Sequence, residues 1–117
     1  MAELSDFSES TVINYEEAMD RFGGSKELYL RLAGKFLDDP HHARLKAALA
    51  ESDLETAYRA AHSLKGVAGN LSFTDLYTVA ARVSDALHAA DAETAMQDMD
   101  ELDAAYTTVN EALASLS

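Results

Sequence analysis

The sequence predicts an all-α protein: an antiparallel up-and-down four-helix bundle with one or two short additional helices at its N-terminal end. Apolar residues recur at steps of three and four along nearly the whole chain, and Pro40 and the Gly23–Gly24 pair stand where helices should end. With 117 residues, 48% of them apolar, the chain has the size of one compact domain. Helices of the predicted lengths with short connections pack antiparallel, which favours the bundle.

The N-terminal region is expected to hold an arm and a short helix. Residues 1–12 are rich in serine and glutamate and are assigned to a flexible arm, so the helical domain is predicted over 13–117. Asn14 followed by Glu17 suits a helix start, because the Asn14 side-chain oxygen can accept a hydrogen bond from a free N–H group. This helix is expected to end at Gly23–Gly24.

Three further helices follow in the prediction. Ser25 begins one, and Pro40 ends it because the residue before a proline is pushed out of helical geometry. A short helix is expected from about 41 to 51. The serine and glutamate of 52–55 form a capping-box pair, which predicts a long helix that ends near Leu71.

Two long helices complete the predicted bundle. Ser72 or Thr74 is expected to begin the first, and Asp91 can cap the second. Their apolar residues form stripes that we interpret as core packing. The stripes consist of Leu76, Val79, Ala80, Val83, Leu87 and Ala90, and then of a heptad-like series, Ala95, Met99, Leu102, Tyr106, Val109, Leu113 and Leu116.

The helix that ends near residue 71 carries a polar stripe that core packing does not explain. At about 100° per residue its apolar residues share one broad face, and His62 lies opposite the centre of that face. Steps of three and four place Arg59, Lys65 and Gly66 beside the imidazole, with Gly69 one turn further. Glycine inside a helix costs roughly 1 kcal/mol relative to alanine. We infer that another surface approaches the helix backbone at these glycines.

The chemistry of this stripe suits phosphoryl transfer. Imidazole is largely neutral near pH 7 and is then a competent nitrogen nucleophile. Lys65 supplies a mobile positive charge within reach of a group carried by His62. In phosphoryl transfer, positioning and charge neutralisation provide most of the catalysis.

The run Ala61–Leu71, AHSLKGVAGNL, resembles the signature of histidine-containing phosphotransfer (HPt) domains. The similarity extends to the Gly-Gly pair before the second helix, to Phe36–Asp38 at the end of that helix and to the helix order, so it covers most of 14–116. Two departures are visible. Ser72–Phe73 stands where the family often has Gly-Ala, and Val83–Ser84 stands where Leu-Glu is frequent.

The resemblance implies a phosphorelay intermediate, which takes a phosphoryl group from the aspartyl phosphate of one receiver domain and passes it to an aspartate of another. His62 would be the phosphoacceptor through Nε2, Lys65 the charge that steadies the phosphoryl oxygens, and Gly66 the gap that admits the receiver. The group that orients the imidazole through Nδ1 stays open. Further candidate contacts of the partner are Gly69, Arg59, Tyr58, Ser63 and Asn70.

The implied partners are the receiver domains of response regulators and hybrid histidine kinases. Mg²⁺ is expected on the receiver and no cofactor on this chain, which is expected to be a monomer. Two other functions stay open: the phosphoacceptor (P1-like) domain of a chemotaxis-type histidine kinase, and a helical module that binds partners with an inert His62. The sequence has no Gly-rich phosphate loop, so an enzyme with its own ATP site is not expected.

Composition excludes several other classes. An excess of 21 acidic over 9 basic residues argues against nucleic-acid binding. The absence of cysteine excludes disulfides and thiolate zinc sites, and His41, His42 and His88 have no companions at metal-ligand spacing. No stretch approaches the ~20 apolar residues of a membrane span, and the acidic N-terminus lacks signal-peptide features. A soluble, cytoplasmic protein is therefore expected.

The charges are unevenly distributed along the chain. All nine Lys and Arg residues lie between Arg21 and Arg82, where seven acidic residues accompany them and the net charge is +2. Residues 1–20 carry −6 and residues 83–117 carry −8. The helix with His62 thus belongs to the mildly basic part, which suits the acidic, Mg²⁺-binding pocket that the resemblance implies for a receiver.

Overall fold

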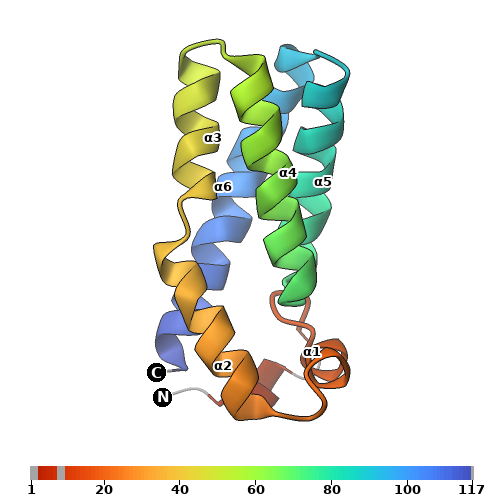
Figure 1. Ribbon diagram of the computed structural model, residues 1–117, viewed down its shortest axis with the longest axis vertical. Coiled ribbons are helices and arrows are strands. Elements are labelled where there is room, and N and C mark those ends of the chain that lie inside the picture. Colours follow the sequence, from red (N-terminus) through yellow and green to blue (C-terminus); the bar gives the residue numbers. More distant parts are fainter. Residues whose placement is uncertain (1–2, 8–9, 117) are drawn as a thin grey trace.

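The computed structural model describes residues 3–7 and 10–116 (Figure 1). Within these residues the chain forms six α-helices and two 3₁₀ helices and no strand, which confirms the all-α prediction. In chain order the elements are η1 (Leu4–Phe7), α1 (Tyr15–Arg21), α2 (Lys26–Gly34), η2 (Lys35–Asp38), α3 (His41–Ala50), α4 (Leu54–Asn70), α5 (Thr74–His88) and α6 (Ala92–Ser115). None of the described helices combines the length and apolarity needed to cross a bilayer.

Helices α3, α4, α5 and α6 run along the long axis of a body measuring 40 × 21 × 19 Å (Figure 1). The chain rises through α3, descends through α4, rises through α5 and descends through α6 in that view. Helix α4 packs between α3 and α5, and α6 packs on α5 and, more lightly, on α3. Helices α1 and α2 lie at the end of the body where both termini are found.

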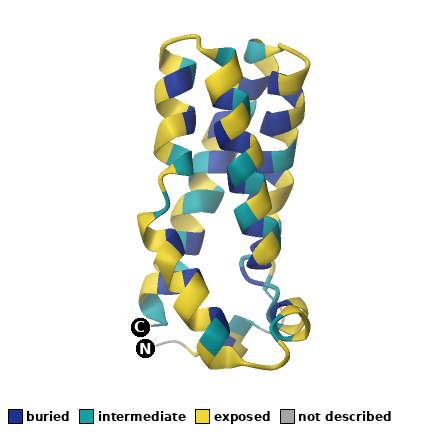
Figure 2. Cartoon of the chain, in the orientation of Figure 1, coloured by how far each residue is buried: buried dark blue, intermediate teal, exposed yellow. Residues whose placement is uncertain are grey.

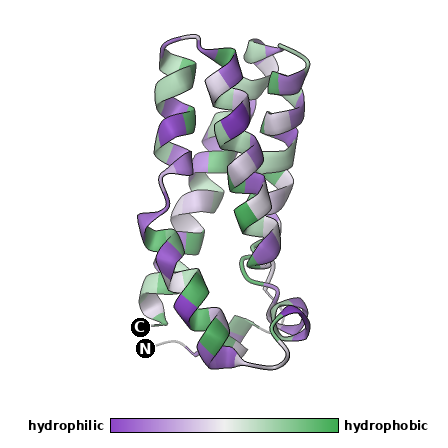
Figure 3. Ribbon diagram, viewed as in Figure 1, coloured by the Kyte–Doolittle hydropathy of each residue, from purple (hydrophilic) through white to green (hydrophobic). Residues whose placement is uncertain are grey.

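The core follows the apolar stripes that the sequence predicts, except at Ala90, which is exposed in the turn after α5 with a left-handed φ of 58°. Figure 2 shows buried residues on the inward sides of the helices, and Figure 3 shows apolar residues on many of these same sides. Tyr29 and Phe36 of the N-terminal elements extend the core, and the buried Tyr29 hydroxyl donates a 2.5 Å hydrogen bond to the Leu71 carbonyl. The largest fully buried aliphatic side chains are Ile13, Leu45, Leu64, Leu76, Leu102, Val79, Val83 and Val109.

Three helix starts that the sequence predicts are confirmed. The side chains of Asn14, Ser25 and Asp91 each accept a 3.1 Å hydrogen bond from the backbone N–H group three residues further on. The chemistry of such a cap is local, because an oxygen on a short side chain needs only an extended backbone at its own residue to reach the free N–H group.

The predicted start of α4 at Ser52 is wrong, because Ser52 belongs to the end of α3. Its φ of 56° is left-handed, and the N–H group of Asp53 bonds back to the Ala48 carbonyl at 2.9 Å, which closes α3 in a Schellman-type turn. Asp53 is the residue that caps α4, where its carboxylate accepts a 3.1 Å bond from the Thr56 N–H group.

The α4–α5 connection repeats this turn. Ser72 has a φ of 60°, and the N–H group of Phe73 bonds to the Ala68 carbonyl at 2.9 Å. Ser72 therefore does not cap α5, which begins at Thr74 without a side-chain cap on its first turn. A left-handed φ favours glycine. This is a physical reason for the glycine that HPt domains, which the sequence resembles, often have at this position.

Helix α2 ends earlier than Pro40 predicts. It stops at Gly34 and tightens into η2, which continues to Asp38. Pro40 then precedes the first residue of α3, His41, whose N–H group donates a 2.9 Å bond to the Asp39 carboxylate. The proline is therefore at the start of a helix, a position that does not require its missing N–H group.

The segment before α1, which the sequence analysis assigns to a flexible arm, contacts the helical domain through several of its described residues. Leu4 of η1 is buried, and Phe7 packs against the core. Thr11 accepts a 3.0 Å bond from the Asp75 N–H group and donates a 2.7 Å bond to the Asp75 carboxylate, so it is attached to the start of α5. The parts of the arm at 1–2 and 8–9, and the domain end at 117, lie outside the described residues.

Candidate functional site

The face that α4 buries is made of small residues, and His62 lies on the other face. Ala57, Ala61 and Ala68 are fully buried between the neighbouring helices, together with Leu64. His62 is exposed and lies midway along the 17-residue helix. The position of His62 that the helical period predicts therefore agrees with the burial pattern, and the imidazole is accessible to a partner. Among the described residues no hydrogen-bond partner is recorded for its ring.

A shallow hollow of about 310 Å³ opens beside His62. Three elements contribute to it: the outer face of α4, one residue of α5 and one residue of α1. The lining residues are His62, Lys65, Gly66, Gly69, Asn70, Tyr77 and Arg21. Four of the predicted partner or charge positions are thus brought together with His62.

The two glycines of this stripe have different surroundings. A Cβ atom added at Gly66 would have no heavy atom within 4 Å outside its own helix backbone. A Cβ atom added at Gly69 would lie 3.1 Å from Cδ1 and Cε1 of the Tyr77 ring. Gly69 is therefore covered by α5, which provides an intramolecular reason for it, whereas no group among the described residues requires glycine at position 66.

Lys65 lies on the same side of the helix as His62. Its side chain is half-buried, and Nζ lies 6.0 Å from the centroid of the Tyr77 ring, a weak cation–π distance. No carboxylate within salt-bridge distance of Lys65 is recorded in the described part of the chain. The ammonium group can therefore turn toward an anion on His62 without first breaking an ion pair.

Tyr58 lies one turn before His62, at the N-terminal end of the stripe. Its ring centroid is 5.8 Å from that of His62 and 5.3 Å from that of His88 on α5. The Tyr58 ring is thus a neighbour of one imidazole on its own helix and of one on α5. Tyr58 can therefore limit the positions of the His62 imidazole.

Of the remaining predicted contacts, Arg59 and Ser63 lie outside the hollow, whereas Asn70 lines it. Arg59 is exposed and forms an ion pair with Glu55, one turn earlier in α4. Ser63 is half-buried and is not among the residues that line the hollow. Asn70 does line it, at the C-terminal end of α4.

The start of α4 is held by a charged cap. The side chain and the backbone N–H group of Thr56 both donate to Asp53, and these bonds hold the pKa of the Asp53 carboxyl below its usual value. Thr94 does the same for Asp91 at the start of α6. Both carboxylates face helix N-termini, where negative charge is favoured.

Sequence reasoning missed Arg21 and Tyr77. Both come from helices other than α4, and no spacing within the chain connects them to His62. The hydrophobic pattern of α5 could have indicated Tyr77, because this large aromatic residue follows the core residue Leu76 and therefore lies on the exposed side of the helix. Its side chain is 41% exposed.

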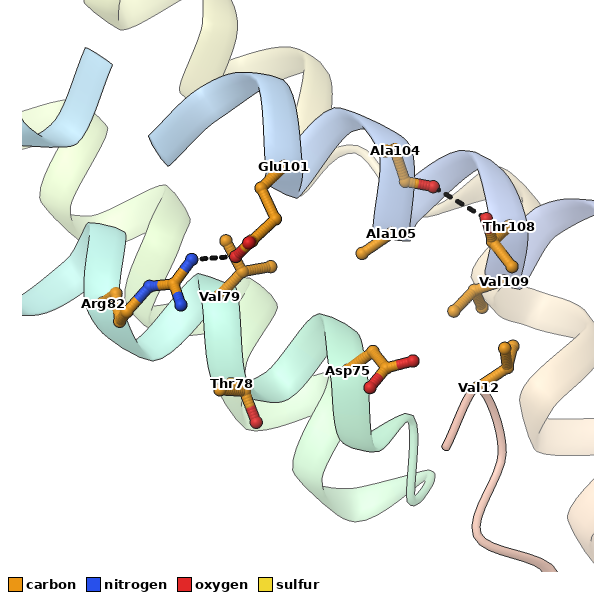
Figure 4. Close-up of a pocket in the computed structure, with 10 residues that line it drawn as sticks. All are labelled: Val12, Asp75, Thr78, Val79, Arg82, Glu101, Ala104, Ala105, Thr108 and Val109. Atoms are coloured by element: carbon orange, nitrogen blue, oxygen red, sulfur yellow. Dashed lines mark hydrogen bonds and ion pairs between the residues drawn. The ribbon is translucent and has the colours of Figure 1, made fainter. Parts of the chain in front are cut away.

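A larger hollow of about 440 Å³ lies between α5 and α6 (Figure 4). Val79, Ala105 and Val109 contribute its apolar surface. Its polar rim is engaged internally: Arg82 pairs with Glu101, and Asp75, Thr78 and Thr108 each take part in a hydrogen bond within the chain. It contains none of the predicted site residues.

The other histidines have structural contacts. His41 Nδ1 lies 2.8 Å from Asp39, and His42 Nε2 lies 2.7 Å from Asp103 while its ring stacks on Tyr106 at 3.9 Å. Across the described residues no group of three or more His, Asp or Glu side chains could hold a metal ion.

Comparison with protein families finds one match. A family model described as Hpt domain matches residues 35–112, about two thirds of the chain, which includes all of α3, α4 and α5 and most of α6. Comparison with curated proteins and with solved structures finds no significant match.

Proposed function

Because the chain belongs to the Hpt domain family, whose members transfer phosphoryl groups through a histidine in two-component signalling, we propose that it is the intermediate of a receiver-to-receiver phosphorelay. In this proposal His62 accepts the group from the aspartyl phosphate of one receiver and delivers it to an aspartate of another. Helices α3 to α6 form the antiparallel four-helix bundle that carries the site.

The observation that carries the proposal is the combination of His62 and Gly66. His62 is exposed midway along α4, and the space above Gly66 is open. A flat receiver surface can therefore approach the α4 backbone one turn from the imidazole, which brings the aspartyl phosphate and the nucleophile together.

The transfer is a pair of in-line displacements at phosphorus. In the first, the lone pair of His62 Nε2 forms the N–P bond while the acyl phosphate P–O bond breaks and the electron pair leaves with the aspartate carboxylate. The proton on Nδ1 stays in place, so the phosphorylated ring is cationic and a good leaving group. In the second, a carboxylate oxygen of the next receiver forms the P–O bond, and the electron pair of the N–P bond returns to Nε2.

Lys65 and the receiver divide the charge stabilisation. The Lys65 ammonium group turns from the Tyr77 ring toward the phosphoryl oxygens, whose negative charge it partly neutralises. Mg²⁺ is supplied by the receiver, so this chain needs no cofactor and no ATP site of its own. The receiver rests against a rim around His62 and Gly66, formed by Tyr58, Arg59, Ser63, Gly69 and Asn70. The Tyr77 ring covers Gly69, so the receiver meets that ring at this position.

The proposal is tested by incubating the purified chain with each phosphorylated receiver domain of the same genome. A receiver is expected to label the wild type with an acid-labile, alkali-stable phosphoryl group, and H62Q is expected to abolish the label. H41Q is the matched control, because His41 is bonded to Asp39 at the start of α3, outside the hollow. Full labelling of H62Q would exclude His62 as the acceptor.

A second arm, in which the chain is incubated with kinase catalytic domains and ATP, separates the other candidate functions. Labelling from ATP by a kinase catalytic domain, with no labelling by any receiver, would instead indicate the phosphoacceptor domain of a chemotaxis-type kinase. No labelling from either source would indicate a module that only binds partners.

A further inference from the structure

Arg21 of α1 lines the hollow that contains His62, although it is 41 residues away in the sequence. It also lines a second hollow of about 280 Å³, which adjoins the first at Gly69 and Tyr77. Arg21 therefore lies toward the C-terminal end of the α4 stripe. Figure 1 shows α1 near this end of α4.

The position of Arg21 favours contact with the partner over contact with the phosphoryl group. Seven residues separate His62 from Gly69, which at 1.5 Å per residue is about 10 Å along the helix axis. Lys65 is one turn from His62 and is the nearer cation. A receiver that covers the stripe from His62 to Gly69 would reach Arg21 with the surface around its phosphoacceptor aspartate.

A chain of contacts holds Arg21 at this edge. Its Nε lies 3.4 Å from Glu17 Oε1, and the same oxygen accepts a 2.9 Å hydrogen bond from the Ser72 hydroxyl. Ser72 is only 2% exposed and is fixed by the turn between α4 and α5. The guanidinium is thus oriented through Nε, which leaves its terminal NH₂ groups available to a carboxylate.

The contact explains one departure of this chain from the HPt pattern. A left-handed φ such as that of Ser72 favours glycine, which the family often has there. Glycine has no hydroxyl group and could not bond to Glu17. Serine is less favourable than glycine in this backbone conformation, but its hydroxyl group can donate the hydrogen bond that holds Glu17 and, through it, Arg21.

We propose that Arg21 is a docking residue for the acidic surface of the receiver, positioned by Ser72 through Glu17. This inference rests on the proposed function. It extends the docking surface from α4 to α1. The hollow itself is then lined by two cations, Lys65 close to His62 and Arg21 at the far end, which suits a partner whose carboxylates surround the reacting aspartate.

The test compares two phosphoryl donors on the full chain. The first is the receiver domain that labels the wild type fastest, loaded with acetyl phosphate and used over a range of concentrations. The second is potassium phosphoramidate, in which the P–N bond breaks, ammonia leaves and the N–P bond to His62 forms without any docked protein. Circular dichroism verifies that each variant is folded.

R21A is expected to raise the receiver concentration for half-maximal transfer by about 2- to 5-fold, the range for one exposed ion pair. The effect should shrink at high salt. The maximal rate and the phosphoramidate rate should stay at wild-type values. R31A, which removes one exposed charge from α2 outside both hollows, should leave all three quantities unchanged.

S72A tests the positioning role. It should raise the half-saturating receiver concentration less than R21A does, and it should add nothing in the R21A background, because Ser72 acts through Arg21. Additive effects of the two substitutions would overturn the positioning role.

Three results would overturn the docking role: an unchanged half-saturating concentration in R21A, an equal loss in R31A, or a matching loss of phosphoramidate labelling in R21A. All three presuppose a wild type that a receiver labels. A wild type that no receiver labels would instead refute the proposed function itself.

Discussion

Gly66 provides a test in which stability and function should change in opposite directions. It lies in the interior of α4, and an added Cβ atom would have no neighbour within 4 Å. Alanine is favoured over glycine in a helix interior by roughly 0.5–1 kcal/mol, because glycine loses more backbone entropy on folding. With no steric cost to offset this gain, G66A should raise the free energy of unfolding by about that amount and Tm by about 2–5 °C.

The same substitution should impair transfer. The methyl group occupies the space through which a receiver would approach the α4 backbone, and G66L occupies more of it. Initial rates of labelling by a phosphorylated receiver should therefore fall from wild type to G66A to G66L, while labelling by phosphoramidate changes little. Urea unfolding followed by circular dichroism gives the stability of each variant.

Two other glycines serve as controls. Gly34 has helical dihedral angles and open space around its Cβ position at the end of α2, so G34A should also stabilise the protein but leave transfer unchanged. G69A should stabilise less than G66A, because its methyl group would lie 3.1 Å from the Tyr77 ring, which must move outward. A G66A variant less stable than the wild type would refute the packing argument, and unchanged transfer in G66L would refute the open approach.

Three further predictions concern single side chains. K65A should slow transfer by roughly 100-fold, the lower end of the range for the loss of a group that stabilises developing charge, while the free energy of unfolding in urea stays within about 0.5 kcal/mol of wild type; equal transfer rates would remove Lys65 from the site. Y29F should lower the free energy of unfolding by about 1–2 kcal/mol, because the Leu71 carbonyl loses a buried donor. Burial also raises the pKa of Tyr29, so the stability of the wild type should fall as pH rises above the ordinary tyrosine pKa of ~10 and that of Y29F should fall less; parallel curves would contradict this. The pKa values of Asp53 and Asp91 are lowered, so their stabilisation is present above the ordinary aspartate pKa of ~3.9 and lost as pH falls through the folded values. In the D53N/D91N double variant the asparagine oxygens can still accept the capping hydrogen bonds, so the free energy of unfolding should fall less steeply below pH ~4 than in the wild type. An equally steep fall would show that other carboxylates determine it.

The helix starts show where sequence reasoning succeeds and where it fails. Asn14 and Asp91 were predicted as caps because capping depends on one side chain and the next turn. Ser52 and Ser72 have the same chemistry, yet each is held at a left-handed φ by the turn that closes the preceding helix. The cap of a helix that follows directly on another is therefore decided by how the first one ends, which local spacing does not reveal.

The candidate site divides in the same way. The helical period alone placed His62 opposite the buried face of α4, and the exposure of its side chain agrees. The same reasoning assigned both glycines to an approaching partner, whereas the Tyr77 ring covers Gly69. Tyr77 reaches the hollow through the packing of α5 on α4, and Arg21 reaches it because the chain brings α1 near the end of α4; such proximity between elements has no period in the sequence.

The distribution of charge explains how so acidic a chain can meet an acidic receiver. Six of the eight acidic residues of 83–117 lie on α6, and α4 and α6 each pack on α3 and α5, so α6 lies across the bundle from α4. The bundle is 21 × 19 Å in cross-section. At physiological ionic strength the Debye length is about 8 Å, so the repulsion from α6 is largely screened at the face of α4. In the proposed docking, Lys65 and Arg21 meet the receiver there at contact distance. In the proposed complex the acidic face of α6 repels a wrongly oriented receiver, so the charge of α6 contributes orientation while the cations beside His62 contribute attraction.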